Sequence, residues 1–252
     1  MTVYLVGAGP GDPGLITAKG LDLIRNCEAL VYDVLVSPEL VDEAPEDALK
    51  ISRENVSQSV INDLLVDLGS QGLEVVRLKG GDPFIFGRGG EEALALAKAE
   101  IPFEVVPGVS ALSAVPASVG IPITHRGVSA QVTLVSGHSA KGEELDYAHL
   151  AKTPGTLVVF MGITNLAQIT EQLIRHGKSG WTPAAVISRG THANGESRTA
   201  NLSKIAEAAT SLESPALLIV GEVISVRDRL AVAQADGHNA LAQSDPLVTS
   251  TS

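Results

Sequence analysis

Short apolar and β-branched runs alternate with helical patterns along the first half of the chain. The runs of strand length cover residues 3–6, 29–32, 73–78 and 103–106. Between them, apolar residues recur at helical spacing over residues 15–25, 56–68, 90–99 and 110–119. This alternation predicts parallel βαβ units, with helices on both faces of one sheet.

The pattern changes beyond residues 120–126, an extended and proline-interrupted segment. The segments that follow read as strands at 131–136, 156–161, 184–188 and 216–220, and as helices near 166–176 and 203–209. We therefore predict an α/β fold with two α/β domains, residues 1–120 and 121–230. Residues 231–252 are rich in Ala, Gln, Ser, Asp and Thr without periodicity, which predicts a disordered tail.

Composition narrows the class of protein further. Cys27 is the single cysteine, which excludes an intrachain disulfide and a cysteine-cluster metal site, and we expect no metal. The net charge of −11 disfavours nucleic acid as a partner. No run reaches the length of a membrane span, and the first 14 residues lack the pattern of a signal peptide. We expect a cytoplasmic protein without a membrane partner.

The loop at residues 7–14, Gly-Ala-Gly-Pro-Gly-Asp-Pro-Gly, contains a G-x-G-x-x-G motif. Asp33 stands about where an acidic ribose ligand of a dinucleotide-binding protein belongs. However, Pro10 and Pro13 lack backbone N–H donors, and Asp12 would repel a phosphate. These three residues therefore argue against a dinucleotide site, despite the motif. A tight turn that binds no ligand stays open as an alternative.

Four loops follow strands of the predicted parallel sheet. They are residues 7–14, Asp33, residues 80–83 and residues 107–108. Ligands of parallel sheets bind at the carboxyl ends of the strands, and these four loops share that edge. Their combination predicts a binding site there.

Residues 80–92 read Gly-Gly-Asp-Pro-Phe-Ile-Phe-Gly-Arg-Gly-Gly-Glu-Glu, the most informative stretch of the chain. This run resembles the signature of uroporphyrinogen-III C-methyltransferases, within the tetrapyrrole methyltransferase family. Further matches are residues 6–13, 32–37, 104–108, 120–126, 182–183, 190–191 and 215–222. Together they extend over about residues 3 to 225.

The resemblance implies S-adenosylmethionine as cofactor, bound in a cleft between the two domains of a homodimer subunit. A sulfonium cation tolerates the acidic, proline-bearing loop that a pyrophosphate would not. By motif position, the implied cofactor contacts are Pro10, Gly80, Gly81, Asp82, Ile85, Ser110, Ala111, Met161 and Gly190.

The implied reaction transfers two methyl groups to carbons of uroporphyrinogen III, giving precorrin-2 for sirohaem or corrinoid synthesis. Carbon methylation leaves a proton to be lost, and Asp33 is the candidate base. Because this tetrapyrrole partner is a polycarboxylate, we expect basic groups in the cleft. The candidates are Arg88, His125 and Arg126 with Arg189, whereas Arg77 and Lys79 alternate along one strand face and are equally compatible with a structural role.

Three positions depart from the family pattern. The family's Gly-Lys-Arg run is replaced by the shortened segment 50–55, so that Lys50 or Arg53 is the candidate for a family lysine implicated in proton transfer. Ser118 stands where Tyr is usual, and Gly195 where Gln is usual. These changes leave two alternatives open: a sister precorrin methyltransferase, or a homologue that binds cofactor or tetrapyrrole without catalysis.

Overall fold

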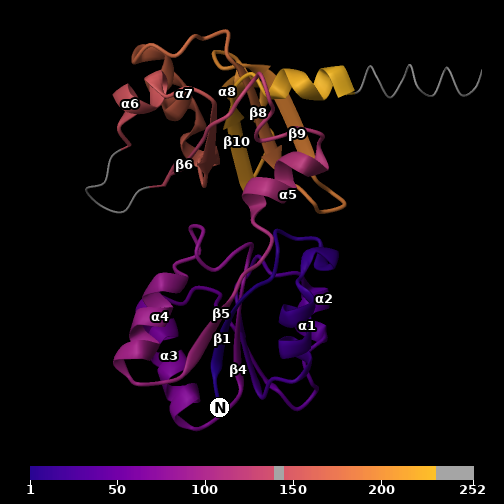
Figure 1. Cartoon of the computed structure of the whole chain (residues 1–252), viewed down its shortest axis with the longest axis vertical. Coiled ribbons are helices and arrows are strands. Elements are labelled where there is room, and N and C mark those ends of the chain that lie inside the picture. The colour runs from indigo at the N-terminus through magenta and orange to yellow at the C-terminus, as the bar shows by residue number, and fades with distance from the viewer. Residues whose placement is uncertain (139–144, 231–252) are drawn as a thin grey trace, which may run out of the picture.

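The computed structural model describes residues 1–138 and 145–230, which form two five-stranded sheets (Figure 1). The strands of the first sheet are β1 (Val3–Gly7), β2 (Ala29–Tyr32), β3 (Leu49–Ser52), β4 (Val75–Lys79) and β5 (Phe103–Val106). Those of the second are β6 (Val132–Ser136), β7 (Thr156–Phe160), β8 (Pro183–Ser188), β9 (Glu196–Asn201) and β10 (Ala216–Val220). The predicted tail, 231–252, lies outside the described residues.

The first sheet is parallel throughout, as predicted, with the order β3-β2-β4-β1-β5. Helices α1 (Ala18–Arg25) and α2 (Pro38–Asp42) cover one face, and α3 (Gln58–Ser70) and α4 (Gly89–Lys98) cover the other (Figure 1). Apolar side chains of the strands pack against these helices on both faces. Ile24 of α1 is buried on one face and Ile61 of α3 on the other. The carboxyl ends of all five strands therefore share one edge.

The second sheet is mixed, with the order β6-β7-β10-β8-β9. Strands β6 and β7 are parallel, and every other pair is antiparallel. One face packs against α6 (Tyr147–Lys152), α7 (Leu166–Arg175) and α8 (Ile205–Ala208). The other face packs against α5 (Ala111–Ser118) and residues near Ile224. Short 3₁₀ turns lie at Pro13–Leu15 and Ile163–Asn165, and residues 224–230 are helical.

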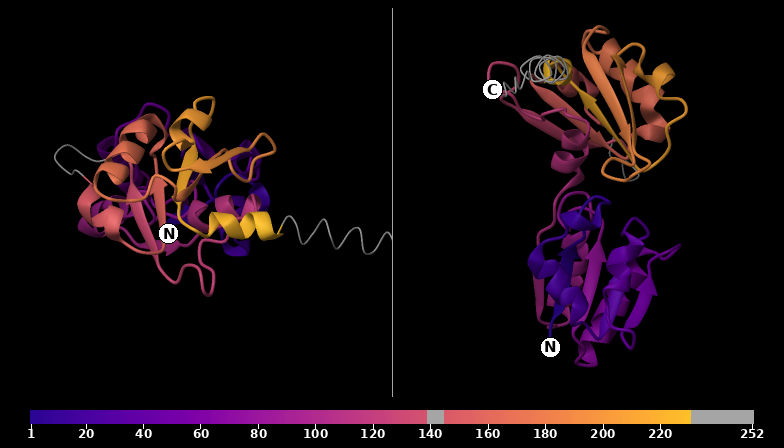
Figure 2. Two further views of the ribbon diagram at one scale, coloured as in Figure 1. Left: turned by 90° about the horizontal axis from the view of Figure 1, so that it is seen from above. Right: turned by 90° about the vertical axis from the view of Figure 1, so that its right-hand side faces the viewer.

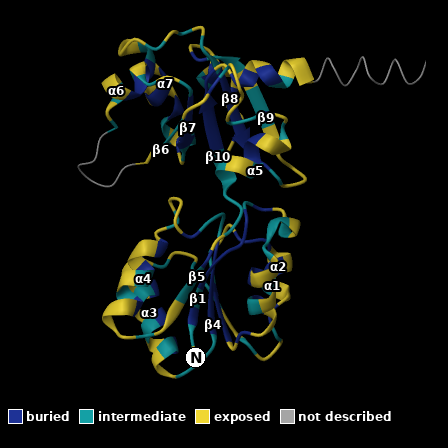
Figure 3. Ribbon diagram, viewed as in Figure 1, coloured by how far each residue is buried: buried dark blue, intermediate teal, exposed yellow. Residues whose placement is uncertain are grey.

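The chain crosses between the sheets once, in the stretch between β5 and α5 (Figure 2). All strands of the first sheet come before this helix in sequence, and all strands of the second come after it. In Figure 3 the central strands of both sheets are buried, while much of the outer surface of the helices is exposed. Within residues 1–138 and 145–230, every helix is too short or too polar to span a lipid bilayer.

The elements α2, β3, α6 and β9, and the helical residues 224–230, were not predicted by the sequence pattern. Strands β3 and β9 are edge strands of their sheets. The sequence of β9, Glu-Ser-Arg-Thr-Ala-Asn, has no apolar run, because an edge strand buries little of its surface. The helix predicted over residues 15–25 starts only at Ala18, because Thr17 caps it and a 3₁₀ turn precedes it.

Candidate active site

Glycine backbones bring three of the four predicted loops into direct contact at the carboxyl edge of the first sheet. Gly9 and Gly81 exchange backbone hydrogen bonds of 3.2 and 2.7 Å. A Cβ atom on Gly108 would lie 2.3 Å from the Gly81 carbonyl oxygen and 2.6 Å from the Gly7 Cα. Only glycine allows these backbones to approach so closely.

Asp82 joins two of these loops through its carboxylate. Its Oδ1 accepts a hydrogen bond from the Phe84 amide at 2.9 Å, and its Oδ2 accepts one from the Gly108 amide at 3.1 Å. Both oxygens are therefore engaged in shaping the loop edge. The sequence predicted Asp82 as a cofactor contact, and in the structure its carboxylate holds the glycine loops together.

An apolar segment extends from this edge toward the second sheet. The ring of Phe86 contacts the ring of Phe160, with centroids 5.1 Å apart. Ile85 precedes Phe86, and Met161 follows Phe160. The ring contact therefore places the segments that carry Ile85 and Met161, two predicted cofactor contacts, next to each other. Ile85 and Met161 are both exposed, and Met161 has a φ of +53° that is uncommon for a residue with a side chain.

Three more predicted cofactor residues lie on segments next to this edge. Ser110 caps α5 by accepting from the Leu112 amide at 3.1 Å, and Ala111 is the first residue of that helix. A Cβ atom on Gly81 would have the Ala111 amide nitrogen, at 3.8 Å, as its nearest neighbour. This face of the Gly81 backbone is therefore open. Gly190 is buried against Val115 of the same helix.

A closed ring of five polar side chains lies beneath the end of β4. Arg77 binds Asp33 and donates to Glu92 Oε1 at 3.1 Å. Gln58 donates to the same Glu92 oxygen at 3.0 Å and accepts from Arg53 at 2.9 Å. An Arg53 nitrogen lies 3.5 Å from Asp33, which closes the ring. We call these five residues the charged ring.

The charged ring is buried on one side and open on the other. The side chains of Arg77 and Glu92 are fully buried, whereas those of Arg53 and Asp33 are 22% and 20% exposed. Lys79 is also fully buried and donates to Glu92 at 2.9 Å. Burial, and next the charge of Arg77, lower the pKa of Lys79 below its ordinary value. The two strand cations thus have structural partners.

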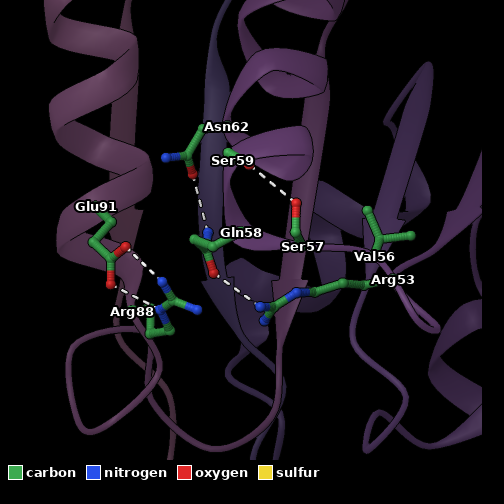
Figure 4. Close-up of a pocket in the computed structure, with 8 residues that line it drawn as sticks. All are labelled: Arg53, Val56, Ser57, Gln58, Ser59, Asn62, Arg88 and Glu91. Carbon is green, nitrogen blue, oxygen red and sulfur yellow. Dashed lines mark hydrogen bonds and ion pairs between the residues drawn. The ribbon is translucent and has the colours of Figure 1, made fainter. Parts of the chain in front are cut away.

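A polar recess of about 570 Å³ opens beside the charged ring (Figure 4). It lies between α3, α4 and the turn after β3. Its lining consists of Arg53, Val56, Ser57, Gln58, Ser59, Asn62, Arg88 and Glu91. Two guanidinium groups and the amino end of α3 therefore face a recess with a single carboxylate, an arrangement that favours anions.

The basic residues that the sequence predicted to bind the substrate lie in different parts of the structure. Arg88 lines the recess and forms two 2.8 Å hydrogen bonds with Glu91, which lower the pKa of that carboxyl. Arg189 pairs with Glu213 at 3.0 Å. His125 and Arg126 lie in an exposed turn, and within the described part of the chain no side-chain contact joins them to Asp33 or to the recess.

The positions that depart from the family pattern also lie in different parts of the structure. Arg53 belongs to the charged ring, whereas Lys50 is exposed on the edge strand β3. Ser118 ends α5 and donates to the Val115 carbonyl at 2.8 Å. Gly195 is exposed in a tight turn, where a Cβ would lie 2.7 Å from the Arg189 carbonyl oxygen.

Sequence reasoning missed the parts played by Glu92 and Gln58. The alternation of Arg77 and Lys79 was the available signal, because two cations on one face of a buried strand require a carboxylate nearby. Glu91 and Glu92 are adjacent on α4 and therefore point to different sides. One of them faces the recess and the other faces the buried cations.

The fold and these loops define a class of two-sheet α/β proteins whose glycine-rich loops gather at the carboxyl edge of a parallel sheet. A family model describing tetrapyrrole (corrin/porphyrin) methylases matches residues 2–206. The chain belongs to this family.

Similar proteins of known sequence or structure agree with this assignment. Siroheme synthase 1 of Yersinia enterocolitica is 47% identical over 236 residues, which cover 91% of this chain and 50% of that protein. A crystal structure of uroporphyrin-III C-methyl transferase from Thermus thermophilus, complexed with S-adenyl homocysteine, superposes with a TM-score of 0.79 at 38% identity. The superposition includes 100% of the Thermus thermophilus chain and 90% of this chain.

A cobalt precorrin-4 methyltransferase shares the fold with a TM-score of 0.81 at 25% identity, over 88% of this chain and 95% of that one. The chain spans about half the length of the curated siroheme synthases that it matches.

Proposed function

We propose that the protein is an S-adenosylmethionine-dependent methyltransferase that methylates two carbons of uroporphyrinogen III to give precorrin-2, for sirohaem or corrinoid synthesis. The observation that carries the proposal is the 38% identity to the Thermus thermophilus enzyme over its whole length. The glycine loops and the charged ring at the carboxyl edge provide the physical basis for the two ligands.

The loop edge fits S-adenosylmethionine, which when bound supplies an electrophilic methyl group. Gly81 has an open backbone face, and exposed Ile85 and Met161 are suited to pack against the face of an adenine ring. The proposed contacts are Pro10, Gly80, Gly81, Asp82, Ile85, Ser110, Ala111, Met161 and Gly190, of which Asp82 acts by fixing the loops. Free phosphate is disfavoured here, because Asp12 carries a negative charge at the first loop.

The recess suits a carboxylate of the tetrapyrrole. Arg53 and Arg88 both line it, and each keeps guanidinium N–H groups beyond those bonded to Gln58 and Glu91. Asn62 and the serines at the start of α3 add further donors. The exposed His125 and Arg126 are proposed to meet other carboxylates of the same substrate.

Asp33 is the proposed proton acceptor. Methylation of a ring carbon leaves one proton to be removed, and a carboxylate at the carboxyl edge is placed for that task. Arg77 and Arg53 both contact the same oxygen of the Asp33 carboxylate, Oδ1. Arg53, and not the exposed Lys50, is therefore the proposed counterpart of the family lysine.

Larger-scale features are proposed on the same basis. The division into domains of residues 1–120 and 121–230 assigns one sheet to each domain, and α5, which packs against the second sheet, precedes the proposed boundary. A cytoplasmic homodimer is proposed from the family resemblance, and the exposed apolar residues Val34 and Leu35 beside Asp33 support a surface that a second subunit covers.

The test is anaerobic incubation of the protein with S-adenosylmethionine and enzymatically generated uroporphyrinogen III, followed by mass spectrometry of the tetrapyrrole. A gain of two methyl groups is expected. S-adenosylhomocysteine binding by calorimetry without any methyl gain would favour a sister precorrin substrate or a binding protein. Asp33→Asn, which keeps the shape of the side chain, should lower kcat at least tenfold, since a positioned base contributes about 10²–10⁴-fold.

A further inference from the structure

One hydroxyl group connects the two sheets of the molecule on the side of the first glycine loop. Thr191 Oγ1 donates to the Pro10 carbonyl oxygen at 3.1 Å and accepts from the Asp12 amide at 3.2 Å. Thr191 lies between β8 and β9, and the other two residues follow β1. Both hydrogen-bonding functions of the hydroxyl are therefore used to join segments from opposite halves of the chain.

Close packing surrounds this hydroxyl. Gly11, between Pro10 and Asp12, is buried, and a Cβ atom there would lie 2.2 Å from His192 Nε2. The imidazole of His192 thus covers the first loop at the point where that loop has no side chain. On the other side, a Cβ on Gly190 would lie 2.6 Å from Val115 Cγ1. The turn at 190–192 is seated against both the first loop and α5.

The backbone at this turn adopts an uncommon conformation. Thr191 has a φ of +74°, in a region that β-branched residues rarely enter, and Arg189 has a φ of +49°. Strain of this kind persists only where the surroundings hold the residue in place. The two hydrogen bonds of the hydroxyl are the directional contacts that hold Thr191.

We propose that Thr191 is a positioning residue for the cofactor. Its hydroxyl fixes the Pro10 loop against the Gly190 turn, and both segments carry proposed cofactor contacts. The ring contact between Phe86 and Phe160 joins the same two sheets at a second place. The inference rests on the proposed function for the identity of the ligand, whereas the contact itself does not depend on it.

The test compares Thr191→Val with Thr191→Ser. Valine keeps the β-branched shape, and with it the backbone strain, but removes both hydrogen bonds, whereas serine retains the hydroxyl. Calorimetry with S-adenosylhomocysteine should show about tenfold weaker binding for Thr191→Val, as expected for the loss of two ordinary hydrogen bonds. Thr191→Ser should bind within about threefold of the parent protein. Thr199→Val is the matched control, because Thr199 is exposed on β9 of the same half.

Two further measurements separate positioning from general stability. In turnover assays, Thr191→Val should raise the KM for S-adenosylmethionine and leave kcat nearly unchanged. In the ligand-free protein, amide hydrogen exchange over residues 9–14 should be faster in Thr191→Val than in Thr199→Val. His192→Ala, at an exposed position, provides a second variant and should weaken binding less than Thr191→Val does.

Unchanged affinity and unchanged exchange in Thr191→Val would overturn the inference. If the parent protein fails to bind S-adenosylhomocysteine, the proposed function is wrong. The exchange experiment then still decides whether Thr191 holds the first loop, because it requires no ligand.

Discussion

At the scale of single residues, Glu92 has the most demanding environment. Its carboxylate is fully buried and contacts both Arg77 and Lys79, which are also fully buried. Charges removed from water in this way are tolerated only when they are paired. The recess and Asp33 therefore depend on a residue that no ligand is expected to touch.

Glu92→Gln should destabilise the protein strongly. The amide keeps the shape of the side chain but leaves two buried cations with one remaining carboxylate, Asp33. Loss of one partner of a buried pair costs about 3–5 kcal/mol, measurable by urea unfolding. Glu91→Gln is the neighbouring control and should change stability by about 1 kcal/mol or less, because its pair with Arg88 is half exposed. Equal effects of the two variants would contradict this account of the charged ring.

Cys27 gives a prediction about pH. Burial raises the pKa of its thiol from the ordinary 9.0 to about 11. Between these values the unfolded chain has released the proton and the folded chain has kept it, so that the contribution of Cys27 to stability declines as pH rises through this window. Thermal unfolding of the parent and of Cys27→Ala, measured from pH 8 to 11, should show a shallower decline for the variant. Parallel declines would rule out this role for the thiol.

At the scale of elements, close approach of β1, β4 and β5 at their carboxyl ends defines the site. Gly108→Ala would place a methyl group 2.3 Å from the Gly81 carbonyl oxygen, and no flexible side chain is available to yield. We expect loss of S-adenosylhomocysteine binding in calorimetry and a lower free energy of unfolding. Gly90→Ala is the control, since nothing lies within 4 Å of its Cβ position and α4 gains about 0.5–1 kcal/mol from the better helix former. Normal binding by Gly108→Ala would show that the loops can separate without consequence.

The sequence predicted the buried elements better than the edge elements. The central strands β1, β2 and β4 have apolar runs because both their faces are covered by helices, and the edge strand β5 has a shorter one. The edge strands β3 and β9 have no such run, and α2 and α6 are too short for a helical period to be visible. Strand ends could be located from Gly, Pro and Asp, and therefore the edge that carries the loops was predictable.

Contacts between distant elements were beyond the reach of sequence periodicity. The charged ring joins β4 to α4 and to the turn before α3, and Arg77 is 44 residues from its ring partner Asp33. Spacing along one element cannot specify which helix face meets which strand. For the same reason, the bonds of Thr191 to the first loop could not be inferred from the sequence.

At the scale of the whole molecule, the ring contact of Phe86 and Phe160 should couple the two sheets. Phe86→Ala removes a contact of the kind worth about 0.5–1.5 kcal/mol beyond its buried area. Amide exchange is expected to accelerate over residues 82–88 and at the end of β7. Phe84→Ala is the control, because that side chain is 59% exposed. If both variants accelerate exchange equally, the ring contact does not couple the sheets.

The single crossing between β5 and α5 has a consequence for the order of events during synthesis. Every strand of the parallel sheet lies before residue 107, so that its full ladder of hydrogen bonds can form while the second half is still being translated. The bonds from Thr191 to Pro10 and Asp12 must wait until the ribosome has released the turn at 190–192. The parallel sheet can thus fold first, and the contacts between the two sheets are completed only after residues 190–192 have been made.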